Sequence, residues 1–295
     1  MTHTRTGSFP IGFRRVSSAW QKNLENVIAF AMENAFAGID VGDLPPEQVK
    51  PITSAGLTIG SVDLKQPWSA LASADAGKRK DAVVIAAEHI RAVAKLGVRN
   101  FFTVIFPEDD AGDRRKSFGL AVQGFAALAE AIAGTGARVV IEGYPGWAPH
   151  YAALCCTPET YRDFFRETAS DAMMINFDPS HLIRMNIDPI RFLGEFAQKV
   201  GHVHGKDTEI LEEQLYEFGN LQPATLAKAH GFGAYHWRYT IPGHGLARWG
   251  MLLRILKDAG YDGMVSIELE DEHFNGTEDG EKRGFIASRD FLVNV

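Results

Sequence analysis

Four short apolar segments of this chain each end in a side chain that can bind a metal ion. They end at Glu142, Asp178, His204 and Glu268. A single carboxylate in such a place is more often a helix cap or an ion-pair partner, but four such endings together favour one divalent-metal site. Three carboxylates and one imidazole form an oxygen-rich ligand set that suits Mn²⁺, Mg²⁺ or Co²⁺, and Zn²⁺ is also compatible with it.

The elements that must position these residues follow from the pattern of the chain. Short β-rich apolar runs alternate with amphipathic helical stretches, which is typical of a parallel α/β protein. Eight strands are expected near Pro10–Phe13, Gly38–Val41, Leu57–Asp63, Val98–Ile105, Arg138–Glu142, Met173–Asp178, Gly201–His204 and Met264–Glu268. Helices are expected over Trp20–Asn34, Ala74–Leu96, Arg114–Ala133, Pro158–Ser170, Asp188–Lys199 and Trp249–Ala259.

These elements favour one closed (β/α)₈ TIM barrel over a doubly wound open sheet. The 295 residues suit a single barrel domain, which typically needs about 250 residues. No Gly-x-Gly-x-x-Gly follows an early strand, which counts against a dinucleotide-binding fold. In a parallel barrel the carboxyl ends of the strands converge at one mouth, where active sites form. The four ligand-type residues would therefore meet there.

One domain, residues 1–295, is predicted, with residues 1–8 as an N-terminal tail. The segment 208–248 between the seventh and eighth strands is too long for a plain loop of the barrel. Its glycines and prolines, among them Gly231, Gly233 and Pro242, indicate an irregular structure. Long loops at this position usually shape a substrate pocket or a subunit contact, so this insertion is expected to serve the active site or a homodimer or homotetramer interface.

Several polar residues near the four strand ends could contact a substrate. His181 lies three residues beyond Asp178, from where it could reach a substrate oxygen or a second metal, or it could be a solvated residue of a capping turn. Lys206 could hold a substrate hydroxyl or phosphate, and Asp207 could orient a histidine, or the two could form an ordinary loop ion pair. His202 faces the same side of its strand as His204. It could be a core histidine or a partner of the ligands.

The insertion and two other loops supply further candidates. The run from Trp237 to Gly245 combines aromatic residues, Arg238, a tight Pro-Gly turn and His244. Trp68 and Trp147 follow the third and fifth strands, and each could place an apolar face against a sugar ring or simply pack within its loop. Arg238 is the second choice as a substrate residue after His181.

Composition excludes several classes of protein. The net charge of −7 gives no general attraction to nucleic acid or to an anionic membrane. No apolar run approaches the roughly 20 residues of a membrane span, and the N-terminus lacks the apolar segment of a secretory signal. Cys155 and Cys156 are adjacent, so a disulfide between them would be strained, and both are expected to be reduced. A cytoplasmic location is expected from these features.

At these residues the chain resembles the xylose isomerase-like barrel superfamily, whose members include ketose 3-epimerases and inosose dehydratases. The resemblance covers roughly residues 9–293. It is carried by Glu142, Asp178-x-x-His181, His202-x-His204-x-Lys206-Asp207, Pro242-Gly243-x-Gly245 and Glu268. It implies a TIM barrel in which the four ligands bind Mn²⁺ or a similar ion. It also implies that Glu142 and Glu268 act as acid and base on opposite faces of the substrate, while His181 and Arg238 hold its oxygens.

The reaction expected from this resemblance is metal-assisted proton abstraction next to the carbonyl of a sugar or polyol. The intermediate would be an enediolate, and return of the proton would complete an isomerisation or epimerisation. Loss of a β-hydroxyl or glycosidic oxygen would instead make the enzyme a dehydratase or lyase, with an inosose or a 3-keto-glycoside as substrate. A non-catalytic sugar- or metal-binding subunit is a third reading.

A DNA-repair role is not expected. The apurinic-site endonucleases share the barrel but need further histidines after the second and third strands. Here those strands are followed by Gly42-Asp43 and Lys65-Gln66.

Overall fold

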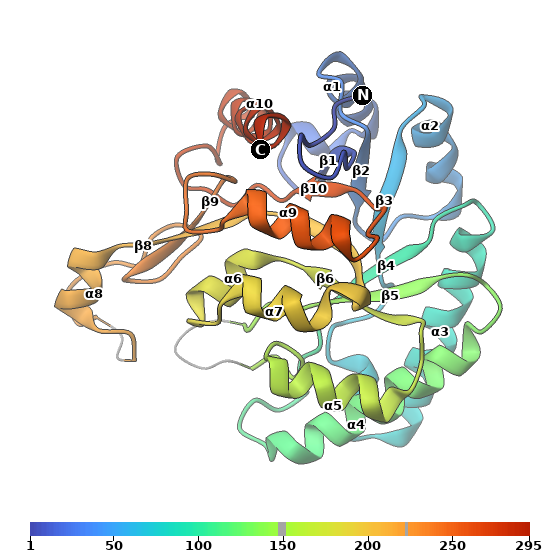
Figure 1. Ribbon diagram of the computed structural model, residues 1–295. Coiled ribbons are helices and arrows are strands. Elements are labelled where there is room, and N and C mark those ends of the chain that lie inside the picture. The colour runs from blue at the N-terminus through green and yellow to red at the C-terminus, as the bar shows by residue number, and fades with distance from the viewer. Residues whose placement is uncertain (147–151, 222–223) are drawn as a thin grey trace.

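The computed structural model describes residues 1–146, 152–221 and 224–295. Eight parallel strands close into one barrel in the order β1-β10-β7-β6-β5-β4-β3-β2 (Figure 1). Their bounds are β1 Ile11–Arg14, β2 Gly38–Val41, β3 Thr58–Asp63, β4 Asn100–Thr103, β5 Arg138–Glu142, β6 Met173–Phe177, β7 Val200–Gly205 and β10 Val265–Ile267. Each overlaps a predicted strand, which confirms the predicted (β/α)₈ TIM barrel.

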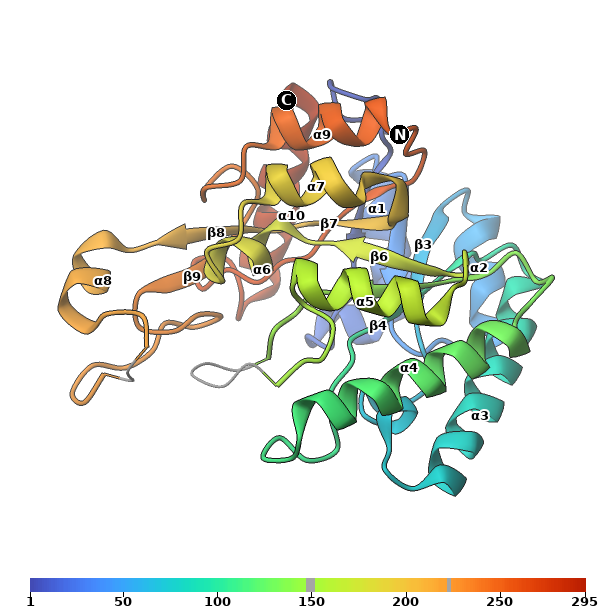
Figure 2. The same ribbon diagram turned by 60° about the horizontal axis from the view of Figure 1, so that its bottom comes forward.

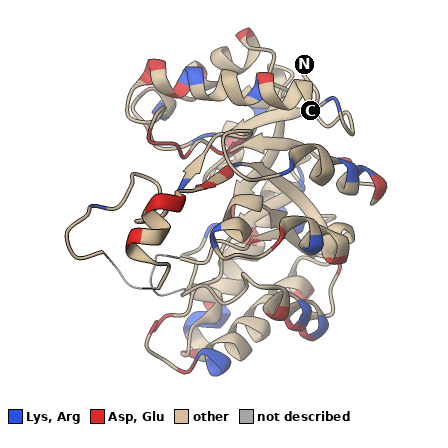
Figure 3. Cartoon of the chain, turned by 60° about the vertical axis from the view of Figure 1, so that its left-hand side comes forward, with Lys and Arg blue, Asp and Glu red and all other residues tan. Residues whose placement is uncertain are grey.

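Helices surround the barrel as an outer layer (Figures 1 and 2). The α-helices are α1 Leu24–Glu33, α2 Val49–Ser54, α3 Ala76–Ala94, α4 Arg114–Ala131, α5 Pro158–Thr168, α6 Pro179–Arg184, α7 Pro189–Phe196, α8 Glu212–Phe218, α9 Trp249–Asp258 and α10 Glu278–Asn294. Charged residues of both signs are spread over these helices (Figure 3). Among the described residues, none of the helices combines the length and the apolar character that a membrane span needs.

Small residues make room in the barrel interior for the side chains beneath the site. A Cβ on Gly60 would come within 2.3 Å of Asp40 Oδ1 and 2.9 Å of His202 Cε1. A Cβ on Gly12 would come within 2.3 Å of the Met264 sulfur. Gly60 therefore leaves room for the side chains of Asp40 and His202 in the interior just below the mouth, and Gly12 leaves room for Met264. Cys155 and Cys156 are buried free thiols, as predicted.

The insertion after β7 is more regular than its glycines and prolines predict. β8 (Asp207–Ile210) and β9 (Trp237–Thr240) pair antiparallel, with Asp207 opposite Thr240 and Ile210 opposite Trp237. This ribbon and α8 extend beyond the barrel in both views (Figures 1 and 2). The prediction of an irregular segment is thus corrected, because the ribbon forms between strands far apart in the sequence that no local pattern links.

Candidate metal centre and active site

The barrel brings the four predicted ligands together at its mouth. Glu142 ends β5, Asp178 follows β6, His204 lies near the end of β7, and Glu268 follows β10. All four are buried, and each offers one ligand atom within 4.8 Å of the others. These positions are spread over more than a hundred residues of sequence, and the convergence of the parallel strands brings them together.

Several buried atoms in this cluster have no hydrogen-bond partner within the described part of the chain. They include Asp178 Oδ2 and both ring nitrogens of His204. Asp178 uses its other oxygen, Oδ1, to cap α6 by accepting from the backbone N–H of Ser180 at 2.8 Å. His204 Nδ1 lies 2.7 Å from Glu142 Oε1 without the geometry of a hydrogen bond. Lone pairs that face one another in a buried space are the arrangement that a shared cation stabilises, so the residues fit a divalent ion.

The charges of the cluster support the same conclusion. Burial and the Glu268 carboxylate act to raise the pKa of Glu142, but His204 and His181 outweigh them and lower it. Burial likewise acts to raise the pKa of Glu268, but Lys206 and His204 hold it well below its ordinary value. Burial acts to lower the pKa of His204, yet Glu268 and Glu142 raise it well above its ordinary value. The two glutamates are therefore held as carboxylates by positive charge, which a divalent ion would also supply.

Two cations flank the ligand Glu268. Lys206 Nζ lies 2.5 Å from Glu268 Oε2, 2.8 Å from Glu270 Oε2 and 3.3 Å from Asp178 Oδ2. Arg14 Nε lies 3.3 Å from the other oxygen of Glu268, and its guanidinium pairs with Asp63 at 2.9 Å. Lys206, for which the sequence left a substrate contact and an ion pair open, therefore contacts three carboxylates of the site. The contribution of Arg14 was not predicted.

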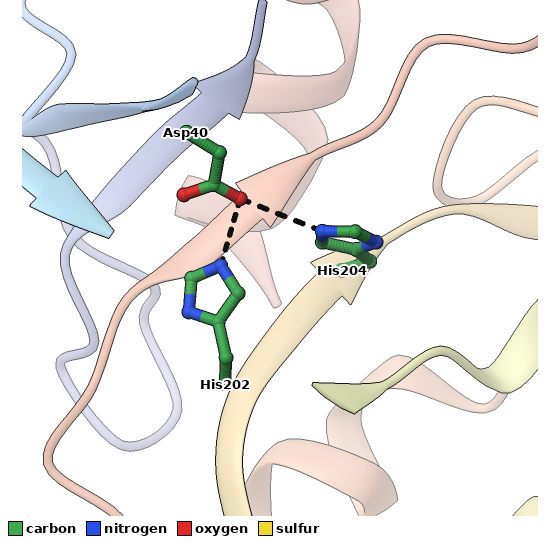
Figure 4. Close-up of side chains that lie close together, drawn as sticks. All are labelled: Asp40, His202 and His204. Atoms are coloured by element: carbon green, nitrogen blue, oxygen red, sulfur yellow. Dashed lines mark hydrogen bonds and ion pairs between the residues drawn. The ribbon is translucent and has the colours of Figure 1, made fainter. Parts of the chain in front are cut away.

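Asp40 of β2, which is not among the four predicted ligands, contacts His204 from the interior of the barrel. Asp40 Oδ2 lies 2.8 Å from His202 Nε2 and 3.4 Å from His204 Nε2, so it sits between the two rings (Figure 4). The ring of Phe102 stacks on His204 with centroids 5.3 Å apart. Asp40 can thus hold His204 with Nε2 towards the interior and Nδ1 towards the other ligands. For His202, whose role the sequence left open, the structure shows a buried partner of Asp40.

His181 faces the ligands from α6. Its Nε2 lies 3.3 Å from Glu142 Oε2 and 3.4 Å from Asp178 Oδ2, and no described residue forms a hydrogen bond with this nitrogen. Its Nδ1 lies 2.7 Å from the hydroxyl of Tyr239. The oxygen of this hydroxyl accepts a hydrogen bond of 2.6 Å from Arg184 Nη1. Because α6 begins at the ligand Asp178, the helix fixes the distance of His181 from the centre.

A cavity of about 380 Å³ lies beside the cluster and connects it with the surface. Its polar lining includes Glu142, Glu268, Lys206 and His181. Its aromatic lining is formed by Trp68, Phe102, Tyr144, Phe232, Trp237 and Tyr239. Apolar ring faces beside a few convergent polar groups are typical of a pocket for a small molecule. The last three aromatic residues belong to the insertion, which therefore forms one wall of the pocket.

Of the other predicted substrate residues, Trp68 lines this cavity, stacked on Phe106. Trp147 lies outside the described residues. Arg238 and His244 line a different cleft, which corrects the predicted pocket. Successive side chains of a strand face opposite sides, so Trp237 and Tyr239 face the cavity, whereas Arg238 pairs with Glu209 at 2.7 Å and Glu272 at 2.9 Å.

Two further corrections concern residues near the mouth. Among the residues that the structure describes, Asp207 has no histidine as a hydrogen-bond partner. It accepts hydrogen bonds from the backbone N–H groups of Thr208, Gly243 and Ala247 and from the indole of Trp249. The arginine that reaches the cavity from the side of His181 is Arg184, one helical turn further along α6. Its spacing from His181 is the signal that could have identified it.

Comparison with known proteins agrees with this fold. Residues 31–294 match the family described as xylose isomerase-like TIM barrel. Among curated relatives, YfiH of Bacillus subtilis is 35% identical over 128 residues, which are 40% of this chain and 37% of that protein. The inosose dehydratase of Lacticaseibacillus casei is 26% identical over 105 residues, 36% of this chain and 33% of that enzyme. The matches thus span about a third of the length of these relatives.

Among solved structures, D-psicose 3-epimerase from Clostridium cellulolyticum H10 superimposes with a TM-score of 0.70 at 16% identity. The match covers 97% of this chain and all of that one, 100%. A similarity at this identity shows a shared fold. The family match over residues 31–294, together with this shared fold, shows that the chain belongs to the xylose isomerase-like TIM barrel family.

Proposed function

We propose that this protein is a divalent-metal-dependent enzyme that removes a proton next to the carbonyl of a sugar or polyol, as an isomerase or epimerase. The observation that carries the proposal is the buried set of Glu142, Asp178, His204 and Glu268 beside a cavity of about 380 Å³. Relatives that act on sugars and cyclitols, an epimerase and a dehydratase, support it. Mn²⁺ is the ion we expect.

Asp178 and His204 would hold the ion together with the two glutamates. When bound, such an ion polarises a substrate carbonyl as a Lewis acid and stabilises the negative charge that develops on its oxygen. The remaining steps belong to side chains of this protein. Glu142 and Glu268 both line the cavity, so each can reach a substrate carbon from a different strand. One takes the proton and the other returns one, on the same or the opposite face.

The two glutamates differ in their surroundings. Glu142 accepts a hydrogen bond of 2.7 Å from Asn176 and faces two imidazoles. Glu268 faces the full positive charges of Lys206 and Arg14. A carboxylate that contacts two full positive charges is a weaker base than one that contacts an amide group and imidazole rings. We therefore assign the first proton abstraction to Glu142 and the return of the proton to Glu268.

A dehydratase or lyase on an inosose or a 3-keto-glycoside is the second candidate, and Lys206 favours it. Elimination needs a group that protonates the departing oxygen. Lys206 is a buried ammonium group that lines the cavity beside Glu268 and Glu270. An ammonium group at this place could supply that proton.

The experiment that tests the proposal incubates Mn²⁺-loaded protein in D₂O with ketoses, inososes and 3-keto-glucosides, followed by NMR. We expect deuterium at the carbon next to a carbonyl in one class of compound. Glu142→Gln and Glu268→Gln should each abolish that incorporation while the protein remains folded. Unimpaired exchange in both variants would refute the assigned roles. A product that has lost water or an alcohol would identify the lyase.

A further inference from the structure

The insertion places one side chain, Tyr239 of β9, directly behind His181. The Tyr239 hydroxyl lies 2.7 Å from His181 Nδ1 and accepts from Arg184 Nη1 at 2.6 Å. All three residues are buried, and all three line the cavity beside the ligands. Arg184 also donates to the carbonyl of Gly146 and lies over the ring of Trp237 at 4.5 Å.

The directions of these hydrogen bonds follow from the chemistry of the groups. A guanidinium can only donate, so the oxygen of Tyr239 is the acceptor in its contact with Arg184. The hydroxyl has one proton, and His181 Nδ1 is the acceptor that the described part of the chain offers for it. A buried hydroxyl without an acceptor is unfavourable because its hydrogen bond to water is lost on burial. His181 Nδ1 is therefore the unprotonated nitrogen, and Nε2 carries the proton of the ring.

The protonated nitrogen points at the reaction site. His181 Nε2 is buried, lies within 3.4 Å of Glu142 Oε2 and Asp178 Oδ2, and has no hydrogen-bond partner among the described residues. A substrate oxygen that entered between these carboxylates would meet an N–H donor there. The same nitrogen in the other tautomer would present a lone pair to two carboxylates and would repel the substrate oxygen.

The base of the ribbon is fixed firmly enough to hold this geometry. The Asp207 carboxylate, fully buried, accepts from Gly243 at 3.2 Å and from Ala247 at 2.8 Å, beyond the end of β9. The hydroxyl of Thr208 in β8 donates to the carbonyl of Ser180, the residue before His181, at 2.8 Å. The ribbon is thus tied to the same helix that carries the imidazole.

We propose that Tyr239 is a positioning residue that holds His181 as the Nε2–H tautomer and aims this N–H at a substrate oxygen. Tyr239 acts only through His181, and Arg184 sets the direction of its hydroxyl. The insertion then has a defined role in the reaction, because it completes the donor that faces the metal ligands. This inference rests on the proposed function for the role of His181, but the tautomer itself can be measured without turnover.

The first test is long-range ¹H–¹⁵N NMR of ¹⁵N-histidine-labelled protein, without added metal or loaded with diamagnetic Mg²⁺. The resonances of His181 are identified by their loss in His181→Gln. We expect one protonated nitrogen, Nε2, and a hydrogen-bonded acceptor at Nδ1. Tyr239→Phe should shift the Nδ1 resonance towards the position of an acceptor without a donor. A protonated Nδ1 in the unaltered protein would overturn the proposal, whether or not a substrate is known.

The second test is kinetic and uses the substrate found by deuterium exchange. Tyr239→Phe keeps the ring, over which Lys206 lies at 4.5 Å, and should lower kcat/KM by about 10- to 100-fold, the usual effect of losing a partner that orients an active-site group. Tyr261→Phe is the matched control. Its hydroxyl donates to the carbonyl of Met264 at 2.7 Å, just before β10 and at the opposite end of the barrel. Equal kcat/KM in both variants, with an unchanged Nδ1 resonance, would overturn the proposal.

Discussion

Replacing Lys206 by methionine should destabilise the metal-free protein strongly. Lys206 is 2% exposed and contacts Glu268, Asp178 and Glu270. At the 2.5 Å separation from Glu268, the attraction is about 7 kcal/mol for an effective dielectric constant of about 20, and desolvation of the ammonium group offsets part of it. Removing one partner of a buried ion pair typically lowers the free energy of unfolding by about 3–5 kcal/mol.

The assay is urea unfolding of the metal-free protein followed by circular dichroism. With a denaturant slope of about 3 kcal/mol per molar, the midpoint should fall by about 1–1.7 M. Saturating Mn²⁺ should restore much of the difference, because an ion bound by the same carboxylates replaces the missing positive charge. Metal should therefore stabilise Lys206→Met more than it stabilises the unaltered protein.

The matched control is Lys282→Met. Lys282 pairs with Glu278 at 2.7 Å on α10, but both side chains are well exposed, at 37% and 57%. Loss of such a surface pair should change the free energy of unfolding by less than about 0.5 kcal/mol. An unchanged midpoint for Lys206→Met, or an equal effect of metal on both proteins, would refute the reasoning.

Two further predictions concern the support of His204. The pKa of His204 is raised well above its ordinary value in the metal-free protein, so its charge stabilises the fold below about pH 6.5 and this contribution is lost as the pH rises through the raised value. Binding of metal at pH 7 should then release about one proton, and calorimetry in buffers of different ionisation enthalpy would contradict this if it found none. Asp40→Asn should weaken Mn²⁺ binding by about 10- to 100-fold in a chelator competition, and an unchanged affinity would show that Asp40 does not orient His204.

The ligands could be predicted because each ends an apolar strand, and a parallel barrel brings the ends of its strands together at one mouth. Asp40 carries the same signal, since it lies near the end of β2. Unlike the four predicted ligands, Asp40 is followed by an apolar residue of its own strand, Val41, and its contacts with His202 and His204 depend on the closure of the barrel. Arg14 also lies at a strand end, but a basic residue there is not a metal ligand. Its contact with Glu268 depends on the closure of the barrel between β1 and β10.

The pocket wall could not be derived from the sequence in the same way. The pairing of β8 with β9 joins strands separated by a long segment, and this pairing decides that Tyr239 faces the cavity and Arg238 does not. The sequence indicates that Trp237 and Tyr239 share one face of β9 and that Arg238 lies on the other. It does not indicate which of the two faces borders the cavity. The role of Asp207 as the anchor of the ribbon likewise depends on backbone groups about 40 residues away.

The central claim is that one divalent ion, held by Glu142, Asp178, His204 and Glu268, enables proton abstraction in this pocket. The most direct measurement titrates Mn²⁺ into metal-stripped protein and follows both bound metal and the rate of deuterium incorporation into the substrate. We predict that the two rise together and level off at one equivalent per chain, and that Asp178→Ala shows neither. Full exchange in the metal-stripped protein, or bound metal with no exchange in any sugar or polyol, would contradict the account.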